Sequence, residues 1–505
     1  MAADGAARPP PPWRTPTGQV VLGALALAAI CLAFADIEIA TVDPWGEMAR
    51  LLGGLVPPDF TATEELGRAI AYTVAFAIIG VAIANVAGFG LALVFHLPGV
   101  ATFCALIRAV HELFWALIFL QVFGLSPLTG VLAIAIPYAG IFAKVYAEIL
   151  EEQDPAPMQA APKGTSAISL FLFVRAPEAW PHFRTYSLYR LECGLRTSAI
   201  LGFLGLPTLG YHLETAFGEG RYDEVWALLL IFFLIVATIR LWARRRLLPF
   251  YLIGAALVLP WDRVAISQNV WRFLTHDIVP APLREGGVLA PKALSEFAEW
   301  TCHLFVDQAI PGAIATLQLA TIALVLTGIL TFLFFPLISP LFFRKPTRMA
   351  GHIFLVALRS TPEYLLAYVL LQLWGPSMLP AILALALHNG AIIGHLVGRY
   401  TETMTLRPDA PRGFDRYAWE AVPRIYRQAL AFLFYRWEVI IRETAILGLL
   451  GVATLGFYID SAFAEIRLDR ALFLIALTAI LNIAVDELSR RIRRRLRLTT
   501  RITTS

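Results

Sequence analysis

Four pairs of oppositely charged residues lie four positions apart, beside or inside apolar stretches of the chain. The pairs are Arg108 with Glu112, Arg359 with Glu363, Glu192 with Arg196, and Glu438 with Arg442. On a helix this spacing places both side chains on one face, where they can form an ion pair. Ionisable residues at membrane depth mark transport paths or gates, whereas the same pairs at a membrane interface are structural. The sequence leaves both roles open, and Arg196 and Arg442 could also give positive potential to an anion path.

The residue types needed for catalysis are missing from these stretches. The sequence holds no Gly-x-x-x-x-Gly-Lys-Ser/Thr phosphate loop, no nucleophile elbow and no metal-ligand spacing. Its four cysteines, Cys31, Cys104, Cys193 and Cys302, are scattered. We therefore expect a chain that is not an enzyme and that binds no metal or cofactor itself.

The composition places the charged pairs in a membrane protein. Of the 505 residues 58% are hydrophobic and 15% charged, whereas soluble domains carry about 25% charged residues. Basic clusters at 240–246, 344–348, 407–436 and 490–497 each adjoin an apolar run. The positive-inside rule assigns such clusters to the cytoplasm. No soluble basic domain is present, which argues against nucleic-acid binding.

The chain contains an internal duplication. Residues 189–211 and 435–457 align without gaps at an offset of 246 and are identical at 13 of 23 positions. The segments around Arg108 and Arg359 are related by an offset of 251, so the second copy is shorter in the polar loop between the two blocks. We predict a cytoplasmic tail at 1–19, permease-like repeats at 20–246 and 247–489, and a basic cytoplasmic tail at 490–505.

Each repeat is expected to contribute six spans, because about 20 apolar residues are needed to cross a bilayer. The prediction is an all-α polytopic protein of about 12 transmembrane helices, arranged as two parallel six-helix repeats with both termini in the cytoplasm. The third spans are expected at 108–123 and 354–374, and the fifth at 196–217 and 439–463.

Glycines recur at matching positions in the two fifth spans. They are Gly202, Gly205 and Gly210 in the first copy, and Gly448, Gly451 and Gly456 in the second. Small residues allow membrane helices to approach closely. We expect these glycines either to pack the helices near the two-fold axis or to leave room for a substrate path.

Three motifs together resemble the phosphonate-type ABC import permeases. The loops that precede the fifth spans carry Gly164 with Pro177 and Gly413 with Pro423, similar to the family's EAA loop. The segment Tyr435-Arg436-Trp437-Glu438 resembles the family's block before a Gly-rich span, and RSTPE at 359–363 resembles its Arg-Ser-x-Pro-Glu segment. The first loop departs from the pattern, with Met158-Gln159-Ala160 in place of Glu-Ala-Ala, and the second has Pro411 where a helix is expected.

The resemblance implies the ABC type I importer transmembrane fold and a role as the permease of an importer for phosphonate, phosphite or a phosphate ester. It implies two copies of a cytoplasmic ATPase, holding ATP and Mg, that dock on the loops at Gly164 and Gly413. A periplasmic or lipid-anchored binding protein would deliver the substrate, and the location would be the bacterial inner membrane. His388 also matches a family position, where a gate and a packing residue remain alternatives.

Other functions fit part of the sequence. An ABC importer for methionine, a metal or another oxyanion would share the loops and the duplication. A 12-span secondary transporter would share only the duplication, and it would place its long cytoplasmic link between the halves. Here the long cytoplasmic loop of each repeat lies between spans four and five, which favours an ABC permease.

Overall fold

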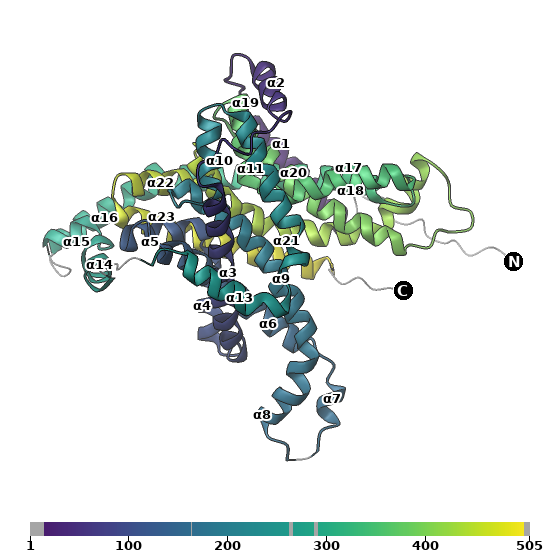
Figure 1. Cartoon of the computed structure of the whole chain (residues 1–505), viewed down its shortest axis with the longest axis horizontal. Helices are drawn as coiled ribbons and strands as arrows, with labels where there is room; N and C mark the ends of the chain where they lie inside the picture. The colour runs from purple at the N-terminus through teal and green to yellow at the C-terminus, as the bar shows by residue number, and fades with distance from the viewer. Residues whose placement is uncertain (1–14, 163, 262–265, 287–290, 499–505) are drawn as a thin grey trace. The chain divides into compact units, whose positions relative to one another are not determined.

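The computed structural model describes residues 15–162, 164–261, 266–286 and 291–498. Over these residues the secondary structure is helical throughout, with no strand (Figure 1). This agrees with a membrane chain, since a helix pairs its own backbone groups in a medium without water. The predicted tails at 1–19 and 490–505 lie partly outside the described residues.

The first repeat forms helices whose bounds are α1 (Pro16–Ala33), α2 (Pro44–Gly53), α3 (Leu66–Leu93), α4 (Pro98–Ala109), α5 (Glu112–Phe123), α6 (Pro127–Glu151), α7 (Ala156–Gln159), α8 (Ala167–Leu170), η2 (Phe171–Arg175), α9 (Ala176–Ile200), η3 (Leu201–Leu204), α10 (Leu209–Gly218), α11 (Tyr222–Ala237), α12 (Ile239–Trp242) and η4 (Arg245–Leu247). The second repeat forms α13 (Leu248–Val258), α14 (Ile266–Arg272), η5 (Phe273–Asp277), α15 (Ala281–Gly286), α16 (Pro291–Leu304), η6 (Phe305–Ala309), α17 (Ile310–Ile338), α18 (Lys345–Ser360), α19 (Glu363–Trp374), α20 (Met378–Tyr400), η7 (Thr401–Thr403), η8 (Arg416–Ala421), α21 (Val422–Leu449), α22 (Leu455–Ala464) and α23 (Leu468–Arg495).

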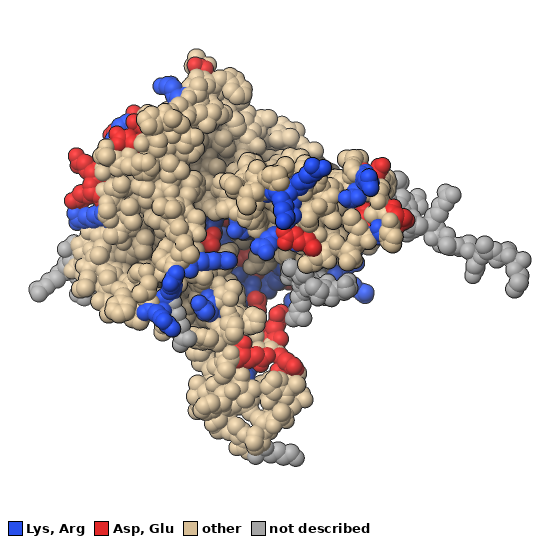
Figure 2. Space-filling model, turned by 45° about the vertical axis from the view of Figure 1, so that its right-hand side comes forward, with Lys and Arg blue, Asp and Glu red and all other residues tan. Residues whose placement is uncertain are grey.

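The chain is a multi-pass, all-α membrane protein. Among the described helices, six are long and apolar enough to cross a bilayer, and up to eight spans result if each of two bent helix pairs counts as one. Each of the twelve predicted spans has a helical counterpart. Some counterparts are not among the six helices counted as long and apolar enough. They are either short, such as α11 and α13, or rich in charge, such as α21. Figure 2 shows charged side chains gathered in patches on a mostly uncharged face.

Each repeat contains an equivalent hydrogen bond that connects two segments far apart in its own sequence. In the first, the Leu209 amide donates to Thr73 Oγ1 at 2.9 Å. In the second, the Leu455 amide donates to Thr316 Oγ1 at 3.1 Å. Leu209 and Leu455 are related by the offset of 246 residues found in the sequence. The duplication therefore extends from sequence to tertiary contacts.

The structure divides into two compact units, which we name after a central helix of each. The α17 unit comprises Met1–Val42, His303–Asp460 and Ala484–Ser505, and the α3 unit comprises Asp43–Cys302 and Ser461–Ile483. In the α17 unit, α1 packs against α17, and in the α3 unit, α13 packs against α3. The first helix of each sequence repeat thus packs with the other repeat. The repeat boundary at 246/247 remains a prediction about the sequence.

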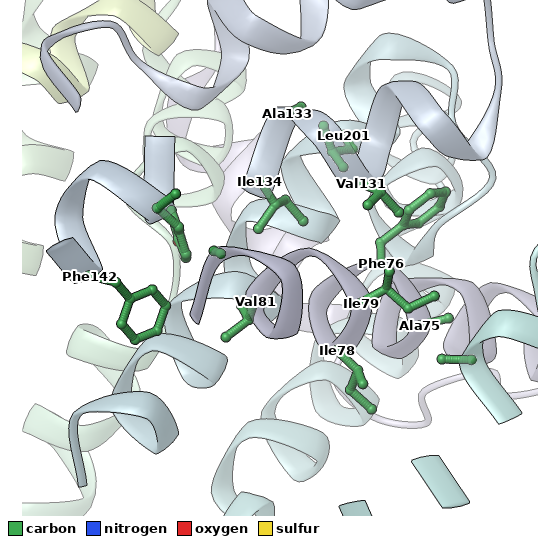
Figure 3. Packing of buried hydrophobic residues seen from close by; sticks show 14 of the residues in the cluster. Ala75, Phe76, Ile78, Ile79, Val81, Val131, Ala133, Ile134, Phe142 and Leu201 are labelled. Carbon is green, nitrogen blue, oxygen red and sulfur yellow. The ribbon is translucent and has the colours of Figure 1, made fainter. Parts of the chain in front are cut away.

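Close helix packing forms the core of the α3 unit. Figure 3 shows Phe76, Val81, Ile134 and Phe142 among the side chains that fill the space between α3 and neighbouring helices. The glycines of α3 admit this approach, since a Cβ on Gly80 would lie 2.8 Å from the Ile134 Cβ. Contact through small residues is typical of helices packed in lipid.

Two expectations about span shape are wrong. The third spans are broken, because α4 meets α5 at 86° and α18 meets α19 at 91°. The fifth spans are broken too: α9 ends at Ile200, and after η3 the chain turns through Gly205 at φ +88° before α10 begins. Gly451 repeats this turn at φ +87°. A residue with a side chain rarely adopts this conformation, so the glycines set the breaks.

Candidate functional site

The bends in the third spans place a glutamate at the start of a new helix in each repeat. In the α17 unit the break falls at Thr361 and Pro362, both extended, and Glu363 begins α19. Proline disfavours helical conformation in the residue before it and lacks an amide proton, which explains the break. Arg359 and Glu363 therefore lie on different helices. The expectation that they share one helix face is wrong, and the same holds for Arg108 and Glu112.

The first repeat makes the same bend without a proline. His111 occupies the position of Pro362 and is extended, with φ −66° and ψ 146°. Its Nδ1 accepts a hydrogen bond from the Leu113 amide at 3.1 Å and so caps α5. The cap satisfies one of the amides that every helix start leaves unpaired. A proline in the second repeat and a histidine cap in the first thus produce the same bend, which indicates that the fold requires it.

His388 of α20 contacts the bend in the α17 unit. Its Nδ1 lies 2.9 Å from the Thr361 carbonyl oxygen and 3.3 Å from that of Leu358. Carbonyl oxygens only accept, so Nδ1 carries a proton. The Nε2 lies 3.6 Å from Glu363 Oε2, and His388 is only 1% exposed. The structure therefore brings together two predicted residues, His388 and Glu363, and connects both to the helix break.

Asn389 and Glu443 extend this cluster to α21. Asn389 is completely buried, and its Nδ2 donates to Leu385 O at 3.0 Å and to Glu443 Oε2 at 3.2 Å. Its Oδ1 accepts no hydrogen bond from the described residues. Glu443 is also buried, at 8% exposure. Sequence reasoning missed both residues, although Glu443 directly follows Arg442 in the repeated block.

The α3 unit has a polar cluster at equivalent positions. Thr197 Oγ1 donates to Glu112 Oε1 at 3.1 Å, and the Tyr138 hydroxyl lies 3.0 Å from that of Thr197. Tyr138 precedes Asn389 by 251 residues and Thr197 precedes Glu443 by 246, the offsets of their segments. The first repeat thus has one carboxylate where the second has two. In the first repeat the Arg190 guanidinium stacks over the Tyr138 ring at 5.4 Å, and the equivalent residue of the second repeat is Arg436.

The remaining predicted arginines surround these clusters. Arg108 and Arg359 lie in the last turns of α4 and α18, beside the two bends. Arg196 lies on α9 with Nη2 3.4 Å from Cys193 Sγ, and Arg442 lies on α21. The clusters themselves present mainly acceptor oxygens, whereas an oxyanion is held by cations and N–H or O–H donors. Their chemistry suits positioning of the bent helices better than direct contact with an anion.

The predicted docking loops contain matching exposed turns. Gly164 has φ +94° and Gly413 φ +65°, and neither would bring an added Cβ within 4 Å of another atom. Pro177 and Pro423 are each the second residue of a long helix, α9 and α21. The first loop forms the short helix α7 at the far end of α6 and α9 (Figure 1), whereas residues 404–412 of the second are irregular. Pro408 and Pro411 in that segment disfavour a helix there.

The predicted glycines of the fifth spans contact their own repeat. A Cβ on Gly210 would overlap the carbonyl oxygen of Ala199, and one on Gly456 would overlap that of Ala445. Gly202 and Gly448 pack equally tightly against the backbone at the starts of α10 and α22. These contacts fold the start of α10 and of α22 back onto the preceding helix. A role near a two-fold axis stays a prediction.

No family model matches the chain. Among curated proteins, it is 24% identical over 497 residues to the phosphate-import permease protein PhnE of Mycolicibacterium smegmatis, covering 91% of each chain. It is 31% identical over 241 residues to the phosphite transport system permease protein PtxC of Stutzerimonas stutzeri, covering 45% of this chain and 86% of PtxC.

A solved structure of an amino acid ABC transporter with histidines covers 40% of this chain at 17% identity and a TM-score of 0.32, a similarity too weak to support an argument. PhnE thus matches the duplicated chain along nearly its whole length. PtxC matches less than half of it.

Proposed function

Because this chain belongs to the family of transport permeases that includes PhnE and PtxC, we propose that it is the membrane permease of an ATP-driven importer for phosphorus oxyanions. Phosphonate, phosphite and phosphate are the candidate substrates. The observation that carries this proposal is the 31% identity to PtxC over 86% of that protein. The match to PhnE over 91% of each chain extends it to both repeats. We place the chain in the bacterial inner membrane with both termini in the cytoplasm.

The loops around Gly164 and Gly413 are the proposed docking sites for two copies of a separate ATPase, which would hold ATP and Mg. Both glycines are exposed and lie in tight turns ahead of a helix that enters the membrane region. A displacement of such a turn by the docked ATPase would move α9 or α21. Those helices carry Thr197 and Glu443, which contact the polar clusters at the bends.

The bends are the proposed moving elements of the transport cycle. Each is held by a few side-chain hydrogen bonds, such as those from His388 to the Thr361 and Leu358 carbonyl groups. Breaking or re-forming these bonds would change the angle between α18 and α19. Arg108, Arg359, Arg196 and Arg442 would supply the positive potential that an oxyanion needs, with Glu112, Glu363 and His388 acting as gate residues. A binding protein outside the membrane would deliver the substrate.

The test is reconstitution of the chain in liposomes with the ATPase and binding protein encoded by neighbouring genes. We expect uptake of phosphite, methylphosphonate or phosphate only when ATP and loaded binding protein are both present. A matched sample with methionine in place of the oxyanion controls for the substrate class. Uptake driven by an ion gradient without ATP would refute the proposal in favour of a secondary transporter.

A further inference from the structure

A basic pocket lies in the α17 unit, away from the polar cluster at the bend. Its cavity measures about 400 Å³ and lies among the end of α17, the start of α18 and the end of α20. The charged and titratable residues in its lining are Lys345, Arg348, His352, Arg399 and Glu402. The size falls in the range of roughly 300 to 1,000 Å³ that is usual for small-molecule sites.

The charge in this pocket is not balanced by its own lining. Arg348 Nη2 pairs with Glu402 Oε1 at 3.1 Å, and Arg348 Nε donates to the Ile338 carbonyl at 3.0 Å. Lys345 and Arg399 add two further cations, both exposed. Among the lining residues Glu402 is the sole carboxylate. Like charges in one cavity repel each other, so an anion entering it would be stabilised.

His352 adds a hydrogen-bonding imidazole to the wall. Its Nδ1 lies 3.3 Å from Nε2 of the buried His395, so one ring donates to the other. The His352 side chain is thus held in place while the residue stays exposed at the pocket. Together the lining offers a lysine, two arginines and an oriented imidazole. This set suits a phosphoryl group, whose oxygens accept several charge-assisted hydrogen bonds.

The first repeat shows that the fold does not need these cations. At the offset of 251, α4 begins at Pro98 where the second repeat has Met349, so the first turn of α18, residues 345–348, has no counterpart. The positions of His352 and Arg399 are occupied in the first repeat by Ala101 and Glu148. The same helices therefore pack without a basic pocket. At the compared positions these cations occur in the second repeat alone, so the shared helix packing does not account for them.

We propose that this pocket binds the phosphoryl group of an anionic ligand, either the head group of an anionic phospholipid or a free phosphate ion. The positive-inside rule places residues 344–348 on the cytoplasmic side, where both sources are present. Ile338 and the exposed Met349 give the lining an apolar part that an acyl chain could contact. The site is separate from the polar clusters and does not depend on which substrate is transported.

The experiment uses the full-length chain in nanodiscs with two probes. Radiolabelled inorganic phosphate is titrated in phosphatidylcholine discs, and retention of phosphatidylglycerol over phosphatidylcholine is measured by native mass spectrometry in mixed discs. The test variant is Lys345→Gln with Arg399→Gln. The control is Arg344→Gln, which removes one exposed positive charge next to the pocket but outside its lining, so it is compared with the expected effect per cation.

We expect the double variant to bind one probe about thirtyfold more weakly, from about fivefold per cation, while Arg344→Gln changes it less than fivefold. Loss of phosphate binding identifies the free ion as the source, and loss of phosphatidylglycerol retention identifies the lipid. Equal behaviour of the double variant and Arg344→Gln with both probes overturns the proposal.

Two further measurements apply if the double variant folds poorly. The pair Lys345→Arg with Arg399→Lys keeps both charges and should retain binding. In the unmodified chain, phosphate or phosphatidylglycerol should slow acetylation of Lys345, measured by mass spectrometry. No protection by either probe would overturn the proposal.

Discussion

Replacement of His388 tests whether the bend between α18 and α19 is held by this side chain. In His388→Leu the two carbonyl oxygens of Leu358 and Thr361 lose their donor at a site that is 1% exposed. A hydrogen bond between membrane helices contributes about 0.6 kcal/mol on average and at most about 1.7. Leaving a buried acceptor without a partner costs about 1–3 kcal/mol. We therefore expect His388→Leu to lose about 1–2 kcal/mol of stability.

His388→Asn is the matched control. The Asn Nδ2 lies close to the position of the His Nδ1 and can still donate to Thr361 O, which the present Nδ1 reaches at 2.9 Å. It gives up the contact of Nε2 with Glu363, which is 3.6 Å long. We expect it to keep at least half of the stability that His388→Leu loses, and to transport measurably where His388→Leu does not.

The assay is thermal unfolding of the purified complex followed by size-exclusion fluorescence, together with ATP-dependent uptake in liposomes. The two variants should separate clearly in both measurements. An unfolding midpoint for His388→Leu equal to that of the unmodified chain would refute the role given to His388. So would a His388→Asn variant as unstable as His388→Leu, because the shared donor position would then be irrelevant.

Three other changes test separate parts of the structure. Gly413→Val forces a branched residue into φ +65° and should abolish stimulation of ATP hydrolysis by loaded binding protein, whereas Gly218→Val, also open but without a positive φ, should not. Gly456→Ala should prevent accumulation of folded protein because its Cβ overlaps the Ala445 carbonyl, and Gly90→Ala on α3, with open space around it, should be silent in the same expression assay. Glu443→Gln keeps an acceptor for Asn389 Nδ2 and should unfold at a midpoint near that of the unmodified chain, whereas Glu443→Leu should lower it by several degrees in the same thermal scan.

The two repeats have diverged where they carry polar groups and remained alike where they pack. The α3 unit has His111, Glu112, Thr197 and Tyr138 at its bend, whereas the α17 unit has a second carboxylate and carries its imidazole on α20. Two lining residues of the basic pocket, His352 and Arg399, are replaced by Ala101 and Glu148 in the first repeat. Duplication within one chain permits this, since each copy can change without changing its partner.

The sequence by itself determined the membrane class, the duplication and the candidate residues Glu112, Glu363 and His388 at the bends. Apolar runs of about 20 residues have few stable outcomes other than spanning helices, because unpaired backbone groups are costly in lipid. Thirteen identities in 23 aligned positions are enough to align the two copies with each other. The second bend was not predicted, although it falls within the motif RSTPE, where Pro362 is a local signal for a break.

Tertiary structure decided the features that depend on which segments meet. Glu443 and Asn389 are 54 positions apart, and nothing local indicates that they share a hydrogen bond. His111 gives no sign in sequence that it caps a helix after a bend, as its Nδ1 does. The sequence also does not indicate that α1 packs with α17 and α13 with α3, since all four helices are predominantly apolar on every face. Hydrophobicity selects the membrane for such helices but not the neighbour, which is chosen by the fit of small side chains across the contact.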